Sequence, residues 1–223
     1  MNPDAMTFDA LEEYHLEPTI VSLEQLKNYL VWWGNSEKEP LPIHLNFDSG
    51  MHRLGFNLKE LDEVVKILLS TENIKVGTVY THLAGAESPS LDESTLKQFD
   101  IYDRICAKLR VGFKDAPLLR SFKTHALNSS GVARFQNHKY DFVRVGIALF
   151  GSELSQKDWG LAPAVSFNTV VSQVMKLPKN EGLSYGFTDS AKQDRTIAWI
   201  PVGYADGYPR SLSNGVGEVC VGK

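Results

Sequence analysis

Cysteine is scarce in this sequence and is not placed for cross-linking or for metal binding. Two of the 223 residues are cysteines, Cys106 and Cys220, and there is no CxxC pair and no histidine at metal-ligand spacing. We therefore expect neither a disulfide framework nor a metal site. A reduced, cytoplasmic setting is the default for such a chain.

Long apolar runs and runs of basic residues are also absent. No apolar stretch approaches the roughly 20 residues that a membrane span needs, and residues 1–16 carry acids where a signal peptide would carry a basic start. The net charge is −4, with acids and bases interspersed. This pattern offers no electrostatic footprint for nucleic acid or anionic lipid, so we expect a small-molecule ligand.

The signatures of several large enzyme classes are missing as well. The sequence has no P-loop, no Gly-x-Gly-x-x-Gly and no nucleophile elbow of a Ser/His/Asp hydrolase. What it does have is 43% hydrophobic and 22% charged residues, which is typical of a folded globular protein and excludes disorder.

Strand patterns alternate with helix patterns over the first two thirds of the chain. We predict strands at residues 19–22, 42–47, 76–84, 118–126 and 142–150. Predicted helices follow a capping box at Ser22, span residues 59–70 and 93–109, and include a short piece after Asn128. Strands separated by helices need crossover connections, which predicts a parallel sheet with its faces covered.

After about Gly151 the pattern becomes β-rich. We predict a long β segment at residues 164–177, a glycine-punctuated turn at 182–188 and a strand at 196–202. The domain boundary is predicted within 152–162, giving domains of residues 1–155 and 156–223. Five parallel strands cannot close a barrel, so we expect both domains to be partial.

Polar residues gather where the predicted parallel strands end, which is where active sites of such folds form. These candidates are Asp48, Met51, Arg53, His82, Glu87, Thr124, His125, Asn128, Ser129 and Arg144. Ser129, Gly146 and Ile147 lie in loops suited to holding phosphate with backbone N–H groups. Each candidate also has an ordinary structural interpretation, such as a salt bridge for Arg144, a helix cap for Asn128 or domain packing for Tyr185 and Tyr204.

Six segments, in order along the chain, resemble the signature segments of the alanine racemase family. They are residues 44–55, 81–84, 125–129, 143–151, 183–186 and 200–210. The resemblance covers residues 17–223 and implies a homodimeric, fold-type III pyridoxal-phosphate enzyme, with a (β/α)8 (TIM) barrel followed by a C-terminal β domain. The expected fold class is therefore α/β, with about the last five strands of that barrel and the start of the β domain.

The resemblance implies that the cofactor is pyridoxal 5'-phosphate and that Arg144 faces its pyridine nitrogen. Because a guanidinium does not give up its proton, that nitrogen would stay unprotonated and the ring would be a weaker electron sink. His82 would lie at the cofactor, near the catalytic tyrosine. Asn128 and Ser129, together with residues 146 and 147 (Gly and Ile), would hold the phosphate.

By the same resemblance, Tyr185 is the catalytic base on one face of the substrate α-carbon, opposite a lysine on the other face. Racemisation needs this geometry, because the proton leaves one side of the carbon and returns on the opposite side. In the family the tyrosine comes from the second subunit, so a homodimer with shared active sites is implied. Arg53 would bind the substrate carboxylate, and Tyr204 would line the substrate access path.

The sequence departs from the family pattern in two ways. Asn46 stands where the family often has a carbamylated lysine, and a neutral amide cannot neutralise Arg53. The Schiff-base lysine precedes the matching segments, and no lysine here, Lys123 included, takes its place. Later β-domain segments are also unmatched, so we expect the polypeptide as given to be an inactive internal fragment.

The activity implied for the parent molecule is interconversion of L-alanine and D-alanine for peptidoglycan, the bacterial cell-wall polymer. Two alternatives stay open from the residues alone. One is a racemase of serine or another small amino acid, and the other is a non-catalytic, truncated half-barrel.

Overall fold

The computed structural model describes residues 3–34, 42–152 and 159–220. The chain divides into two compact units, Met1–Ala164 and Val165–Lys223. The predicted boundary between residues 155 and 156 lies outside the described residues. Within the described ranges no helix has both the length and the apolar character that crossing a membrane requires.

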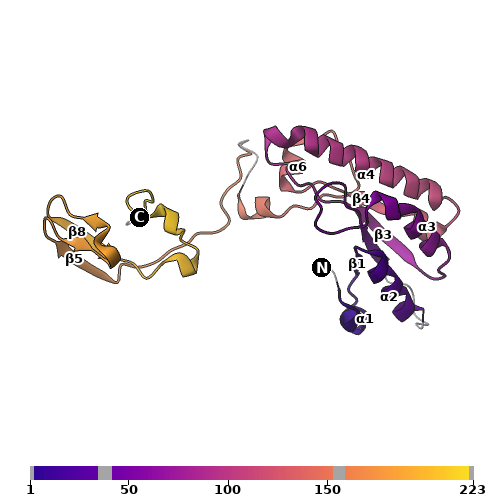
Figure 1. Ribbon diagram of the computed structural model, residues 1–223, viewed down its shortest axis with the longest axis horizontal. Helices are drawn as coiled ribbons and strands as arrows, with labels where there is room; N and C mark the ends of the chain where they lie inside the picture. Colours follow the sequence, from indigo (N-terminus) through magenta and orange to yellow (C-terminus); the bar gives the residue numbers. More distant parts are fainter. Residues whose placement is uncertain (1–2, 35–41, 153–158, 221–223) are drawn as a thin grey trace. The chain divides into compact units, whose positions relative to one another are not determined.

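The first unit is built on a four-stranded parallel sheet whose strand order is β1-β2-β3-β4 (Figure 1). The strands are β1 (Thr19–Ile20), β2 (Pro42–Asn46), β3 (Lys75–Tyr80) and β4 (Lys123–His125). The helices between them are α2 (Leu23–Trp33), α3 (Leu61–Leu69), α4 (Asp92–Gly112) and α5 (Pro117–Arg120). These crossovers allow consecutive strands to run parallel, and the α/β prediction is confirmed.

The sheet is apolar on one face and polar on the other. In β2, Ile43 and Leu45 are fully buried in one core cluster that also contains side chains of α2, α3 and α4. His44 and Asn46 alternate with them and so project from the opposite face. We predicted a sheet covered on both faces by helices, but the second face carries the polar cavity described below.

Two further helices lie outside the sheet segment of the chain, one before β1 and one after β4. Helix α1 (Phe8–Glu13), which we did not predict, buries Phe8 against Tyr29 and Trp32 of α2, with ring centroids 5.5 Å apart in both pairs. Helix α6 (Ser129–Arg134) is the short helix predicted after Asn128. Short 3-10 turns complete the unit at Ala5–Thr7, Leu58–Glu60, Pro89–Leu91 and Ile147–Phe150.

The strands predicted at 19–22 and 76–84 end at Ile20 and Tyr80, and two further strand predictions in this unit fail over most of their length. Residues 118–126 form a strand only at Lys123–His125, because Pro117 occupies the first turn of α5, a position that favours helix initiation. Residues 142–150 make a single bridge, from Phe142 to His125, and then turn into a 3-10 helix after Gly146. The sheet therefore has four strands and one bridge where we expected five strands.

The second unit is a set of short antiparallel pairs. Strand β5 (Gln173–Leu177) pairs with β8 (Arg195–Trp199), and β6 (Gly182–Leu183) pairs with β7 (Asp189–Ser190). The strand predicted at 196–202 is thus confirmed in part. Of the long segment predicted at 164–177, only the last five residues are a strand. Its upstream side chains Val165, Phe167 and Val170 are exposed and have no partner strand among the described residues.

Candidate functional site

A cavity of about 440 Å³ opens on the polar face of the parallel sheet, at the carboxyl ends of its strands. It combines two arginines with three histidines. The residues that line it are Thr19, His44, Asn46, Phe47, Asp48, Met51, Arg53, Leu54, Thr78, Tyr80, Thr81, His82, His125 and Arg144. The first unit therefore brings together Arg53, His82 and Arg144, three of the predicted site residues.

Arg144 is anchored from several sides. Its Nη1 donates to Nδ1 and to the carbonyl of His125, and its Nη2 donates to the carbonyls of Thr81 at 2.6 Å and Ala126 at 3.2 Å. The guanidinium also lies over the ring of Tyr80, 5.1 Å from its centroid. The described residues include no acceptor for its Nε–H, which leaves that donor available to a ligand.

The contacts of Arg144 fix the protonation of two histidines. Nδ1 of His82 lies 3.2 Å from Nη2, and Nδ1 of His125 accepts from Nη1. Because arginine only donates, both imidazoles accept at Nδ1 and are neutral. Burial, Arg144 and His44 lower the pKa of His125 to about 4, and burial, Arg144 and Arg53 lower the pKa of His82.

A chain of hydrogen bonds continues from Arg144 across the sheet. Nε2 of His125 donates to Oγ1 of Thr78 at 2.9 Å, and Oγ1 of Thr78 lies 2.8 Å from Nδ1 of His44. Nε2 of His44 lies 2.7 Å from a carboxylate oxygen of Glu17. Since a carboxylate only accepts, Nε2 of His44 donates to Glu17, and the chain of hydrogen bonds connects the buried cation with that carboxylate.

Arg53 is presented by a tight loop after β2. Backbone bonds from Asp48 N to the Phe56 carbonyl and from Phe56 N to the Asn46 carbonyl, both 2.9 Å, close the loop. Gly55 has φ +123°, and a Cβ there would lie 2.7 Å from the Asp48 nitrogen, so only glycine fits without strain. Arg53 is exposed at the cavity and has no hydrogen-bonding or ionic partner within the described part of the chain.

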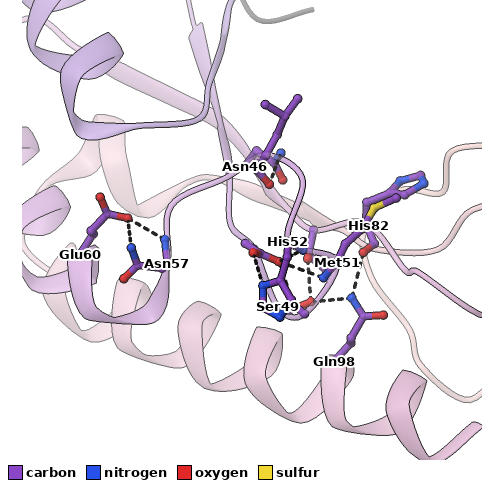
Figure 2. A network of polar contacts seen from close by, with 12 residues as sticks. Asn46, Ser49, Met51, His52, Asn57, Glu60, His82 and Gln98 are labelled. Atoms are coloured by element: carbon purple, nitrogen blue, oxygen red, sulfur yellow. Dashed lines mark hydrogen bonds and ion pairs between the residues drawn. The ribbon is translucent and has the colours of Figure 1, made fainter.

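The carboxylate of Asp48 organises the same loop. Its Oδ1 accepts from the backbone nitrogens of Gly50, Met51 and His52 at 2.9–3.0 Å, and its Oδ2 lies 2.9 Å from Nδ1 of His52. Burial alone would raise the pKa of Asp48, but the hydrogen bonds from His52 and Gly50 lower it below its usual value. Figure 2 shows Met51 and His52 on this loop.

Asn46 carries an unsatisfied acceptor at the cavity wall. Its Nδ2 donates to the Leu54 carbonyl at 3.3 Å, whereas its Oδ1 is buried without a hydrogen-bond partner. A buried acceptor of this kind costs free energy until a donor reaches it.

The residues predicted to hold phosphate lie together around the start of α6. Oδ1 of Asn128 caps the helix by accepting from Gly131 N at 2.9 Å. Oγ of Ser129 accepts from the backbone nitrogens of Gly146 at 3.0 Å and Ala148 at 3.4 Å. Ile147 is exposed and begins the 3-10 turn. The N–H of Gly146 is therefore engaged by Ser129, and the Ser129 hydroxyl proton is the donor still available.

Tyr185 and Tyr204 belong to the second unit, where both side chains are extensively exposed. Tyr185 is 99% exposed at the tip of the turn between β6 and β7. The preceding Ser184 has φ 59° and ψ −161°, a conformation almost confined to glycine, and Gly186 has φ +71°. Strain of this kind is characteristic of functional sites.

Our sequence reasoning missed His44, Thr78 and Glu17 as members of the site. A signal for two of them exists in the strands, where His44 follows Ile43 and Thr78 precedes Val79. Polar residues that alternate with buried apolar ones in a predicted parallel strand mark a polar face. Glu17 precedes β1 and carries no such signal.

Family models match nearly the whole chain. The model described as alanine racemase, N-terminal domain, matches residues 2–153, and the model described as alanine racemase, C-terminal domain, matches residues 164–223. The chain belongs to the alanine racemase family. The resemblance predicted from the six segments is thereby confirmed.

Curated alanine racemases align with most of this family member. Alanine racemase 1 of Oceanobacillus iheyensis is 36% identical over 80% of this chain and 47% of its own length. The alanine racemase of Halothermothrix orenii is 34% identical over 96% of this chain and 55% of its own length. The chain thus spans about half the length of the curated relatives it matches.

Solved alanine racemase structures have the same fold. The E. faecalis enzyme superposes with a TM-score of 0.77 at 26% identity, covering 95% of this chain and 56% of that one. The Bacillus anthracis enzyme, a structure with bound L-Ala-P, has a TM-score of 0.75 at 29% identity over 94% of this chain and 54% of that one.

Proposed function

We propose that this chain is part of a pyridoxal 5'-phosphate-dependent alanine racemase that interconverts L-alanine and D-alanine. The observation that carries the proposal is the environment of Arg144. A partly buried guanidinium held by three backbone carbonyls and two neutral histidines lines a cavity that a second guanidinium, Arg53, also enters. An anchored guanidinium and a second, exposed one suit a ligand set with a basic ring nitrogen and a carboxylate.

The residues present fit the cofactor. When bound, pyridoxal 5'-phosphate supplies an electron-withdrawing ring that stabilises negative charge at the substrate α-carbon. Arg144 would donate to the ring nitrogen and, because a guanidinium keeps its proton, would leave that acceptor unprotonated. We assign the phosphate to the Ser129 hydroxyl and to the backbone N–H groups of Ile147 and Gly146, beside Asn128, with the phosphate replacing Ser129 Oγ as the acceptor of the Gly146 N–H.

We assign substrate orientation to Arg53. Its guanidinium is exposed at the cavity and without a partner in the described residues, so it can pair with the carboxylate of an amino acid. The orphaned Oδ1 of Asn46 lies in the wall of the same cavity. We propose that a donor on Arg53 or on the substrate satisfies it when the site is loaded.

We assign the α-carbon proton on one face to Tyr185. Its exposure and the strained backbone beside it support a role at a surface outside its own turn. We propose that a second copy of the chain receives this tyrosine in a homodimer with shared active sites. In that homodimer His82 would lie near the Tyr185 hydroxyl and influence its proton. Tyr204 would border the substrate path.

The finer architecture and the setting follow from the same proposal. We propose that the parallel sheet belongs to the last five strands of a (β/α)8 barrel at residues 1–155, and that residues 156–223 begin a C-terminal β domain. The protein would act in the cytoplasm and supply D-alanine for peptidoglycan. A racemase of serine or another small amino acid, and a non-catalytic half-barrel, are the competing possibilities.

Solvent exchange of the α-proton tests the proposed function. We would incubate L-alanine, D-alanine and L-serine separately in D2O with cofactor and the longest form of the protein that carries these residues. The forward and reverse kcat/KM of a racemase must change together, because its equilibrium constant is one. The effect of Tyr185→Phe on one face of the α-carbon is therefore measured by α-proton exchange from each alanine enantiomer separately.

The expected result is racemisation of alanine in preference to serine by the unmodified protein. Tyr185→Phe should lose exchange from one alanine enantiomer and retain it from the other, because only one face loses its base. Equal retention from both enantiomers would contradict the role of Tyr185. Preference for serine, or absence of exchange from every substrate, would favour the corresponding alternative.

A further inference from the structure

Gln98 of α4 connects two loops of the candidate site, although it belongs to none of the segments that resemble the family. It is 4% exposed. Its Oε1 accepts from Ala84 N at 2.9 Å, and its Nε2 donates to the His82 carbonyl at 3.0 Å and to Ser49 Oγ at 3.4 Å. Figure 2 shows this amide between the loop after β2 and the segment that carries His82.

The Ser49 branch extends toward Arg144. Oγ of Ser49 lies 2.7 Å from Oγ1 of Thr81, and both residues are buried. The carbonyl of Thr81 accepts from Nη2 of Arg144 at 2.6 Å. Three of the predicted site residues, Arg53, His82 and Arg144, are thus carried by segments that one hydrogen-bond network connects.

The packing at Gly50 shows how closely the loop approaches the helix. A Cβ at Gly50, which has φ +140°, would lie 3.3 Å from Cγ of Gln98. This position therefore combines a backbone conformation that glycine favours with a contact that leaves little room for a side chain. The loop is held against Gln98 by packing as well as by hydrogen bonds.

The chemistry of the position favours an amide. One acceptor and two donors are used at the same side-chain end, and a glutamine provides both. A carboxylate would lose the donors, and an apolar side chain would leave the Ala84 N–H without its partner.

We propose that Gln98 is the positioning residue that fixes the loop carrying Arg53 relative to His82 and to the Thr81 carbonyl that anchors Arg144. The inference rests on the proposed function only for the roles of these residues, because the geometry is a property of the chain itself. Its consequence is that the cavity loses its arrangement when Gln98 is replaced, without loss of the surrounding fold.

NMR on the 223-residue chain tests this inference with Gln98→Met. The matched control is Gln25→Met, because Gln25 is also a buried helical glutamine that accepts from a backbone nitrogen, that of Val21, but its hydrogen bonds do not reach either loop of the candidate site. The readouts are hydrogen exchange of the Ala84 amide, the imidazole shifts and pKa of His82, and the thermal midpoint. None of them requires cofactor or racemase activity.

We expect Gln98→Met to accelerate exchange of the Ala84 amide about tenfold relative to the control, in keeping with one lost hydrogen bond. We also expect it to shift the His82 imidazole signals and pKa, which Gln25→Met should leave unchanged. Equal exchange rates and unchanged His82 signals in the two variants would overturn the proposal. These results stand apart from the proposed function, which the α-proton exchange experiment tests.

Ser49→Ala keeps the inference testable if Gln98→Met does not fold. It removes the bonds of the loop to Gln98 and to Thr81 but keeps the Gln98 bonds to Ala84 and His82, so exchange of the Met51 amide should become faster while the Ala84 amide stays protected. An unchanged Met51 amide would contradict the proposed connection. In an active form of the protein, Gln98→Met should lower kcat about tenfold. The shorter amide of Gln98→Asn should not restore kcat, because it cannot reach the same three partners. Restoration of kcat by Gln98→Asn would overturn the requirement for an amide at the position of the Gln98 side-chain end.

Discussion

Individual side chains at the cavity are constrained by one permanently charged neighbour. Arg144 forces His82 and His125 to accept at Nδ1, and this holds both imidazoles neutral. A protonated His125 would face the guanidinium with a second positive charge and no acceptor. The stability of the fold should therefore depend on pH between the pKa values of His125 in the folded and the unfolded chain.

We predict that the free energy of unfolding falls as the pH is lowered from about 6.5 to about 4. The pKa of His125 is about 4 in the folded state and near 6.5 when unfolded, so the unfolded chain takes up the proton first and gains population. A histidine whose pKa is lowered by folding contributes fully to the free energy of unfolding above its unfolded pKa and loses that contribution as the pH falls. Urea unfolding at a series of pH values measures it.

His125→Gln should flatten this pH dependence, and substitution of the exposed His15 should not. Glutamine can still donate to Thr78 and accept from Arg144 but does not titrate. The lowered pKa of His82 contributes in the same direction, so part of the slope should persist in the variant. An unchanged slope in His125→Gln would contradict the assignment of the buried imidazole.

We predict that Gly55→Ala lowers the free energy of unfolding by about 2 kcal/mol, because of strain at its positive φ and a contact with backbone that cannot move aside. Chemical denaturation measures the loss. The loop that presents Arg53 should be the first region to lose amide protection. A loss below about 0.5 kcal/mol, the range of an ordinary surface substitution, would show that the loop accommodates a side chain there.

At the scale of secondary-structure elements, apolar spacing predicted the long helices and failed for unpaired strands. Leu61, Val64 and Leu68 repeat at helical spacing and are buried in α3, and Phe99, Tyr102 and Ile105 do the same in α4. The segment at 142–150 is equally apolar, but a strand needs a continuous partner edge. Only one bridge to β4 forms, and Gly146 then interrupts the extended backbone.

Helix α6 shows that one residue can satisfy both a structural and a functional interpretation. We predict that Asn128→Ala lowers the free energy of unfolding by about 1 kcal/mol, because the cap to Gly131 N is lost. Asn128→Asp keeps the acceptor and should retain most of that stability. Equal losses in the two variants, measured by urea unfolding, would contradict the capping role.

At the scale of the whole molecule, the sequence predicted the family and the residues of the cavity better than it predicted the residues that hold the cavity in place. Arg53, His82 and Arg144 lie in recognisable segments at strand ends. Gln98 lies in an ordinary helix, and its contacts arise from the tertiary approach of distant segments. Hydrogen bonds of this kind have no local sequence pattern, so only the folded structure reveals them.

The central claim is that the cavity around Arg144 binds pyridoxal 5'-phosphate, and its most direct test is the Kd of that compound for the 223-residue chain. Arg144→Lys keeps the charge but loses the planar fork, and Arg104→Lys makes the same change at an exposed arginine on α4. We predict binding that weakens at least about tenfold in Arg144→Lys and is unchanged in Arg104→Lys. Equal affinity in all three proteins, or no binding to the unmodified chain, would contradict it.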